Sequence, residues 1–146
     1  MRLQIAEPMK SEIADVLLTL GAAVVYVFLL GWITSVEWAA HGGEPISGTF
    51  QIWILPLLIE SLVAGLLGLG VGTLLRTDRS TLYGALLGAA LFSFYAAATT
   101  VNFGGARWQD LAWITLDLLL PACMAAAATV WGHRRRKAAS LKAAAG

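Results

Sequence analysis

The sequence has few of the residues on which soluble enzymes and secreted proteins depend. It contains one cysteine, Cys123, and two histidines among 146 residues. A single cysteine excludes an internal disulfide and a paired-thiol metal site. His41 and His133 flank the apolar runs, which excludes a haem held by two histidines within a bundle. The chain also lacks a nucleophile with its base, a phosphate-binding loop and a nucleic-acid-binding motif. We therefore expect no enzymatic activity, no cofactor and no nucleic-acid partner.

Charge is also scarce. Only 13% of the residues are charged, against about 25% in a typical soluble domain, whereas 58% are hydrophobic. Four apolar runs are each long enough to cross a bilayer, because about 20 residues suffice. They are residues 13–36, 50–75, 82–101 and 111–131, with a basic tail at 132–146. The sequence thus predicts an all-α integral membrane protein, a four-transmembrane-helix bundle forming a single membrane domain.

Positive charge lies almost entirely on one side of the predicted membrane. Four spans place both termini on the same side as the loop between the second and third spans. Nine of the ten basic residues fall there, and only Arg107 falls on the other side: Arg2, Lys10, Arg76, Arg79, Arg134, Arg135, Arg136, Lys137 and Lys142. Because basic residues favour the cytoplasmic side, we expect a multi-pass protein of a bacterial inner membrane with both termini in the cytoplasm.

The basic tail has two interpretations. Its cluster is expected to contact anionic lipid headgroups, or it acts as a plain stop-transfer anchor. The cluster consists of Arg134, Arg135, Arg136 and Lys137.

The chain also shows an internal similarity. A shift of 69 residues places Lys10 over Arg79 and Tyr26 over Tyr95, and the second and fourth spans align with Glu60 over Asp117. This pattern suggests two tandem helical hairpins related by a pseudo-twofold axis along the membrane normal. The alternative is coincidence, since apolar segments align easily with one another.

Two acids lie within predicted spans. A charge in hydrocarbon costs roughly 2.5–3.5 kcal/mol on insertion scales, so Glu60 and Asp117 are expected to have partners. At about 1.5 Å per residue, both stand roughly 24–26 Å from the basic boundary, level with Tyr26 and Tyr95. These four residues predict a buried polar layer. The layer either binds a proton or cation, or it is structural and fixes helix register.

Small residues and one loop complete the candidate sites. Gly65, Gly68 and Gly72 form a stripe that would allow close packing against other membrane subunits or a second copy of the chain. Gly84 and Gly88 form a small-xxx-small pair for packing between helices. In the first loop, Glu37, His41 and Glu44 have the side-chain chemistry of zinc ligands. A hydrated outer loop is the simpler interpretation of these three residues.

Two function classes fit these observations. The first is a non-enzymatic accessory or scaffold subunit that packs against other membrane subunits in the lipid bilayer. The second is a proton- or cation-linked transporter or channel that uses Glu60 and Asp117.

Overall fold

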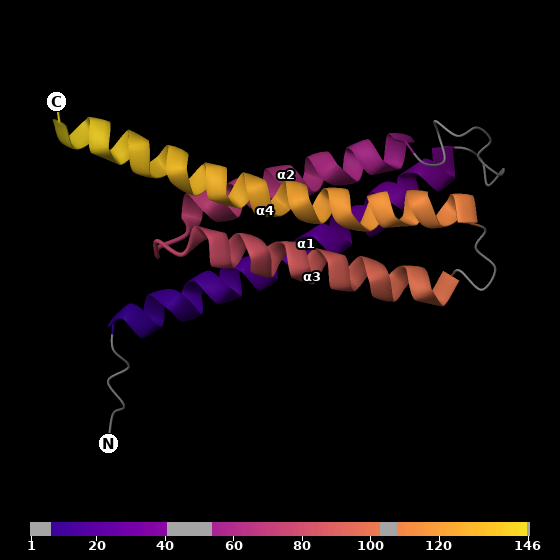
Figure 1. The fold of residues 1–146 in the computed structure, drawn as a ribbon, viewed down its shortest axis with the longest axis horizontal. Coiled ribbons are helices and arrows are strands. Elements are labelled where there is room, and N and C mark those ends of the chain that lie inside the picture. Colours follow the sequence, from indigo (N-terminus) through magenta and orange to yellow (C-terminus); the bar gives the residue numbers. More distant parts are fainter. Residues whose placement is uncertain (1–6, 41–53, 103–107, 146) are drawn as a thin grey trace, which may run out of the picture.

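A computed structural model describes residues 7–40, 54–102 and 108–145 of the chain (Figure 1). Within these ranges the protein is helical except for the turn at residues 75–79, and it contains no strand. The four helices are α1 (Glu7–Ala40), α2 (Leu55–Leu74), α3 (Ser80–Asn102) and α4 (Trp108–Ala145). The predicted all-α architecture is confirmed.

Three of the four described helices have the length and composition of membrane spans. These three are long and apolar enough to cross a bilayer, within Met9–Ile33, Leu55–Leu74 and Ala112–Ala145. The described apolar part of α3, Ser80–Phe94, is shorter. The bundle thus has the dimensions of a multi-pass membrane protein.

Helix α4 continues well past the predicted end of its span at residue 131. Its 38 residues give a length of about 57 Å, almost twice the roughly 30 Å hydrocarbon core. The basic tail is therefore part of the helix as far as Ala145. The physical reason is composition, because alanine, leucine, lysine and arginine are strong helix formers.

The two prolines of the second and fourth spans occupy different helical positions. Pro56 lies in the first turn of α2, where a proline costs nothing because that N–H has no helical partner. Pro121 lies inside α4. Only Pro121 therefore removes a hydrogen bond within its helix.

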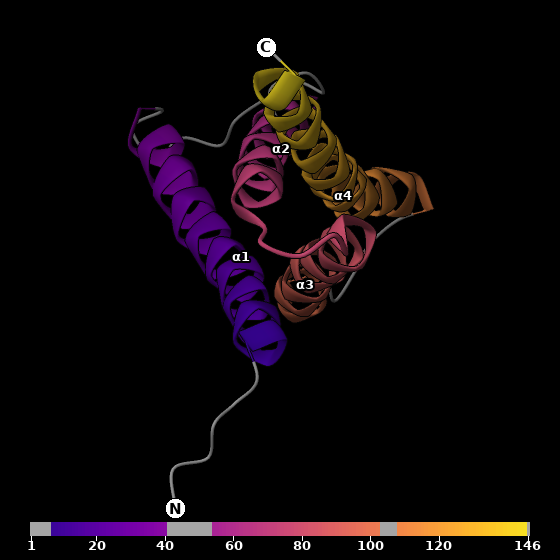
Figure 2. The same ribbon diagram turned by 90° about the vertical axis from the view of Figure 1, so that its left-hand side faces the viewer.

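The ends of the helices define two ends of the molecule. Figure 1 shows the start of α1, the short α2–α3 turn and the end of α4 at the same end. This is the grouping expected of an even number of spans. The view along the bundle in Figure 2 places α1 to one side, with α2, α3 and α4 gathered on the other.

Helix α4 is the centre of the bundle, because both α2 and α3 pack closely along it. Gly68 of α2 lies against the backbone of Ala125, and Gly72 lies against that of Thr129. A methyl group added to Gly84 would stand 2.8 Å from the carbonyl oxygen of Ala126. Cβ atoms rarely come that close to a backbone oxygen. The GxxxG spacing therefore brings two helices onto the small residues of α4.

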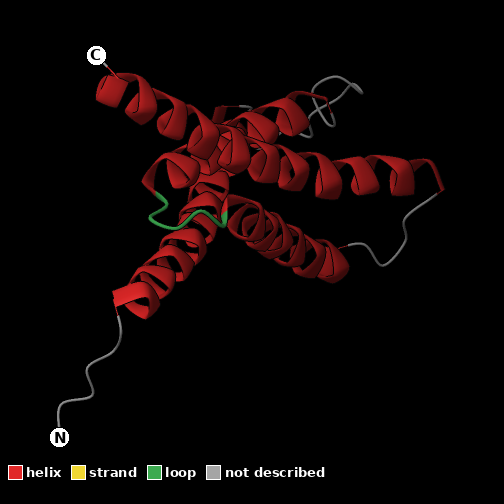
Figure 3. Cartoon of the chain, turned by 60° about the vertical axis from the view of Figure 1, so that its left-hand side comes forward, coloured by secondary structure: helices red, strands yellow, loops and turns green. Residues whose placement is uncertain are grey.

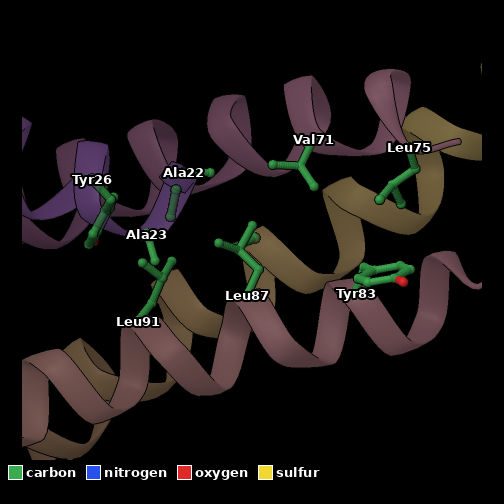
Figure 4. Close-up of a cluster of buried hydrophobic side chains, with 10 residues drawn as sticks. Ala22, Ala23, Tyr26, Val71, Leu75, Tyr83, Leu87 and Leu91 are labelled. Carbon is green, nitrogen blue, oxygen red and sulfur yellow. The ribbon is translucent and has the colours of Figure 1, made fainter. Parts of the chain in front are cut away.

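Helix α1 crosses the bundle obliquely and is less closely packed than the others (Figure 3). Its contact with the bundle includes Ala22, Ala23 and Tyr26, which join Leu87 and Leu91 in the buried core shown in Figure 4. The rest of this helix presents bulky apolar side chains to the surroundings.

The two hairpins are not equivalent in packing. Helices α3 and α4 contact each other extensively, whereas α1 and α2 contact each other little. A pseudo-twofold axis would require similar packing in both hairpins. The described residues therefore lend no support to the internal repeat.

Candidate functional site

A buried polar layer brings together three of the four residues predicted to form one. The side chains of Tyr26 and Glu60 are enclosed, with only 1% and 5% of each residue exposed. The Tyr26 hydroxyl lies 3.5 Å from the main-chain oxygen of Glu60, a long hydrogen bond. The carboxyl groups of Glu60 and Asp117 are joined by a hydrogen bond, with Asp117 half-buried. Glu60 therefore faces the interior of the bundle.

The packing of α2 on α4 explains this pairing. Glu60 and Asp117, Gly68 and Ala125, and Gly72 and Thr129 are each separated by 57 residues. The constant offset means that the two helices are parallel and keep the same register of residue pairs along their contact. The glycine contacts set this register, and it carries the two acids to the same level.

The chemistry of the pair follows from its hydrogen bond. Two carboxyl groups share a hydrogen bond only when one of them carries a proton, because an ionised carboxylate has no hydrogen to donate. Pro121 has no N–H, so the main-chain oxygen of Asp117 loses its usual helical donor. Ser61, next to Glu60, is buried, and its hydroxyl has no hydrogen-bond partner among the described residues. One proton shared between the two acids would join them directly, and the Ser61 hydroxyl leaves hydrogen-bonding capacity unused among the described residues.

Other predicted site residues fall outside the described part of the chain. The side chains of Tyr95 and Glu37 are not described, and His41 and Glu44 lie in the 41–53 segment. Within residues 7–40, 54–102 and 108–145, no three histidine, cysteine or acidic side chains gather as metal ligands would.

The glycine stripe of α2 faces its own chain. The sequence favoured a partner surface at Gly65, Gly68 and Gly72, but the latter two are in contact with α4. Gly65 is half-buried, and a methyl group there would meet only the flexible end of Met124 at 3.7 Å. The pair Gly84 and Gly88 likewise packs on α4. Gly68, Gly72, Gly84 and Gly88 therefore serve packing within the bundle.

Asp15 of α1 makes the contact that sequence reasoning missed. Only 1% of this residue is exposed. Its carboxylate accepts hydrogen bonds from the main-chain N–H groups of Arg76 and Thr77, each at 2.9 Å, and from the Thr77 hydroxyl at 2.8 Å. Asp15 thereby satisfies donors in the turn that follows α2. An aspartate in the first turn of the predicted first span, with a very short loop at the same end, was the available signal.

A second polar cluster joins α4 to the same turn. Asp78 accepts hydrogen bonds from Lys137 at 3.1 Å and from His133 at 3.3 Å. The Lys137 and His133 contacts hold the pKa of the Asp78 carboxyl below its usual value. Arg136 donates to the main-chain oxygen of Thr73 at 2.9 Å. Two cations of the basic cluster are therefore used within the chain.

Comparison with known proteins finds no protein family, curated protein or solved structure that matches this chain. The functional argument therefore depends on the geometry of the described residues.

Proposed function

We propose that this chain is an accessory subunit of a membrane complex, a non-enzymatic protein of a bacterial inner membrane with both termini in the cytoplasm. The observation that carries the proposal is the outward face of α1. Phe28 and Trp32 of this helix are 75% and 67% exposed. They lie one turn apart on the same face of α1. The small core residues Ala22 and Ala23 lie on the face that packs against the bundle.

The contrast between the two faces of the bundle supports this role. Helices α2 and α3 bury their small residues against α4, whereas α1 keeps most of its bulky side chains outside. Aromatic side chains are enriched at interfaces, since they bury a large area with few rotatable bonds. A partner helix that packs along α1 would bury both Phe28 and Trp32.

The buried polar layer is compatible with a structural role in such a subunit. Tyr26, Glu60 and Asp117 come from three different helices and contact one another inside the bundle. Interhelical polar contacts in membranes are worth about 0.6 kcal/mol on average. They fix how the helices align and so hold α1 at one depth.

Site-specific photocrosslinking in native membranes tests the subunit role. A photoreactive residue at Phe28 or Trp32 should form a crosslink to another protein. The matched control is Leu119 of α4, an exposed apolar residue on a different face, where only lipid should be captured. Capture of lipid alone at all three positions would exclude the proposal.

A second candidate function is a proton- or cation-linked transporter or channel. The observation that favours it is the contact between the carboxyl groups of Glu60 and Asp117 inside the bundle, a pair that a single proton could bridge. Such intramembrane acids often mark ion and proton pathways.

Flux measurements in liposomes separate the two candidates. For a transporter, Glu60→Gln and Asp117→Asn should leave the protein folded and abolish proton or cation flux. Glu12→Gln, which changes a partly exposed acid near the start of α1, should have no effect. For an accessory subunit, the same two substitutions should change stability or assembly only, and wild-type liposomes should show no flux above empty ones.

A further inference from the structure

An apolar groove runs between α2 and α4 on the outside of the bundle. Its volume is about 350 Å³. The α2 side is formed by Leu62, Gly65, Leu66 and Leu69, and the α4 side by Met124, Ala127, Ala128 and Trp131. The lining residues extend over seven residue steps on each helix, from Leu62 to Leu69 and from Met124 to Trp131. At about 1.5 Å of rise per residue, the groove is about 10 Å long. Gly65 has no side chain and Ala127 and Ala128 have short ones, which makes the surface concave at this place.

Positive charge begins where the groove ends. The α4 side of the groove follows the helical period through Met124, Ala128 and Trp131, and one further turn along the same face brings Arg134 and Arg135. The Arg135 guanidinium lies 4.5 Å from the centre of the Trp131 ring. Trp131 is both a wall of the groove and a support for this cation. The apolar groove therefore leads directly to a positive charge that is held in place.

The other cations of the cluster are placed differently. Arg136 contacts the main-chain oxygen of Thr73, and Lys137 contacts Asp78. Arg136 points toward the end of α2 and Lys137 toward the α2–α3 turn, rather than along the groove face. The groove thus ends at Arg134 and Arg135 alone.

We propose that this groove binds one acyl chain of an anionic phospholipid of the bilayer, with the phosphate of the same lipid paired to Arg135. The occupant follows from complementarity, because a phospholipid joins an apolar chain to a negative charge in the order that the groove presents. Arginine is well suited to phosphate, since its planar fork donates two hydrogen bonds at once. The site rests on the membrane location proposed above and is independent of the subunit or transport role.

Native mass spectrometry of the detergent-purified full chain tests the site. The probes are phosphatidylglycerol and phosphatidylcholine with identical acyl chains. Wild-type protein should bind phosphatidylglycerol more tightly by about fivefold, the factor that one basic residue contributes near an anionic surface. Arg135→Gln should remove this preference and leave phosphatidylcholine binding unchanged.

Lys142→Gln is the charge-matched control. It removes an exposed cation two turns further along α4 and should leave the preference intact. Equal losses in Arg135→Gln and Lys142→Gln would mean that the tail attracts anionic lipid diffusely, which would overturn the proposal.

The acyl-chain contact has its own variants. Ala127→Leu fills the groove and should weaken binding of both lipids while leaving their ratio unchanged. Ala89→Leu enlarges an exposed alanine on the α3–α4 face and should have no effect. Leu66→Trp fills the same groove from α2 and takes the place of Ala127→Leu if that variant does not fold. Unaltered binding in a folded groove-filled variant would also refute the site.

Discussion

At the scale of single residues, Asp15 is a buried polar link between α1 and the α2–α3 turn. Its carboxylate faces two main-chain N–H groups and one hydroxyl of the α2–α3 turn. A buried acceptor that serves three donors is sensitive to substitution, because each donor left without its acceptor costs free energy.

Asp15→Asn should lower the free energy of unfolding by about 1.5–3 kcal/mol, the usual range for hydrogen bonds to a charged group. The asparagine amide keeps one acceptor oxygen, but its NH₂ group would face the N–H groups that the second carboxylate oxygen now accepts. The measurement is unfolding in mixed micelles with increasing SDS. Glu12→Gln is the control, because its ion pair with Arg79 (3.1 Å) is exposed and worth under about 1 kcal/mol. Similar losses in the two variants would contradict the role given to Asp15.

Asp78 predicts a pH dependence at the same end of the molecule. Lys137 and His133 lower the pKa of its carboxyl below the unfolded value of 3.8. The contribution of the Asp78 carboxylate to folding stability is therefore fully present above pH 3.8. It is lost as the pH falls through the lower pKa of the folded state. In thermal unfolding, wild-type protein should be more stable than Asp78→Asn at pH 6, and the difference should vanish at the acid end. A difference that persists unchanged below pH 3 would argue against this ion pair.

At the scale of helices, the glycines of α2 make a prediction with an internal control. A methyl group at Gly72 would collide with the backbone of Thr129, whereas one at Gly70 would meet nothing within 4 Å. Gly72→Ala should destabilise by about 1–3 kcal/mol, the cost of overpacking. Gly70→Ala should stabilise slightly, because alanine is the better helix former by up to about 1 kcal/mol. The same SDS unfolding assay compares the two, and equal effects would mean that α2 does not approach α4 closely.

The helices were predictable from the sequence, but their neighbours were not. Length and hydropathy alone identify a span, since about 20 apolar residues suffice. The stripe at Gly68 and Gly72 was also visible, because helical spacing determines which residues share a face. The same spacing does not say which helix covers that face, and only the structure shows that α4 does.

The candidate site was predictable to a similar degree. Counting from the basic ends placed Glu60, Asp117 and Tyr26 at one depth, and in the structure they meet. Depth could not reveal Asp15, because two of its three donors are main-chain N–H groups of a turn 61 residues away. Main-chain donors leave no mark in the amino-acid sequence.

At the scale of the whole molecule, the orientation in the membrane can be measured directly. In a Cys123→Ser background, Ser47→Cys probes the first loop and Ser140→Cys probes the end of α4. With both termini in the cytoplasm, a membrane-impermeant maleimide should label residue 47 in spheroplasts and residue 140 only in inverted vesicles. The reverse pattern would invert the proposed topology.

The Asp15 contact also has a consequence for synthesis of the chain. The acceptor is translated 61 residues before its first donor at Arg76. At about 5–20 residues per second, α1 therefore waits roughly 3–12 s before the turn that completes it exists. During that time water at the membrane surface must hydrate the carboxylate, so α1 reaches its final depth and tilt only after α2 has been inserted. Helix α1 is thus translated before α2 but is fixed in place only after it.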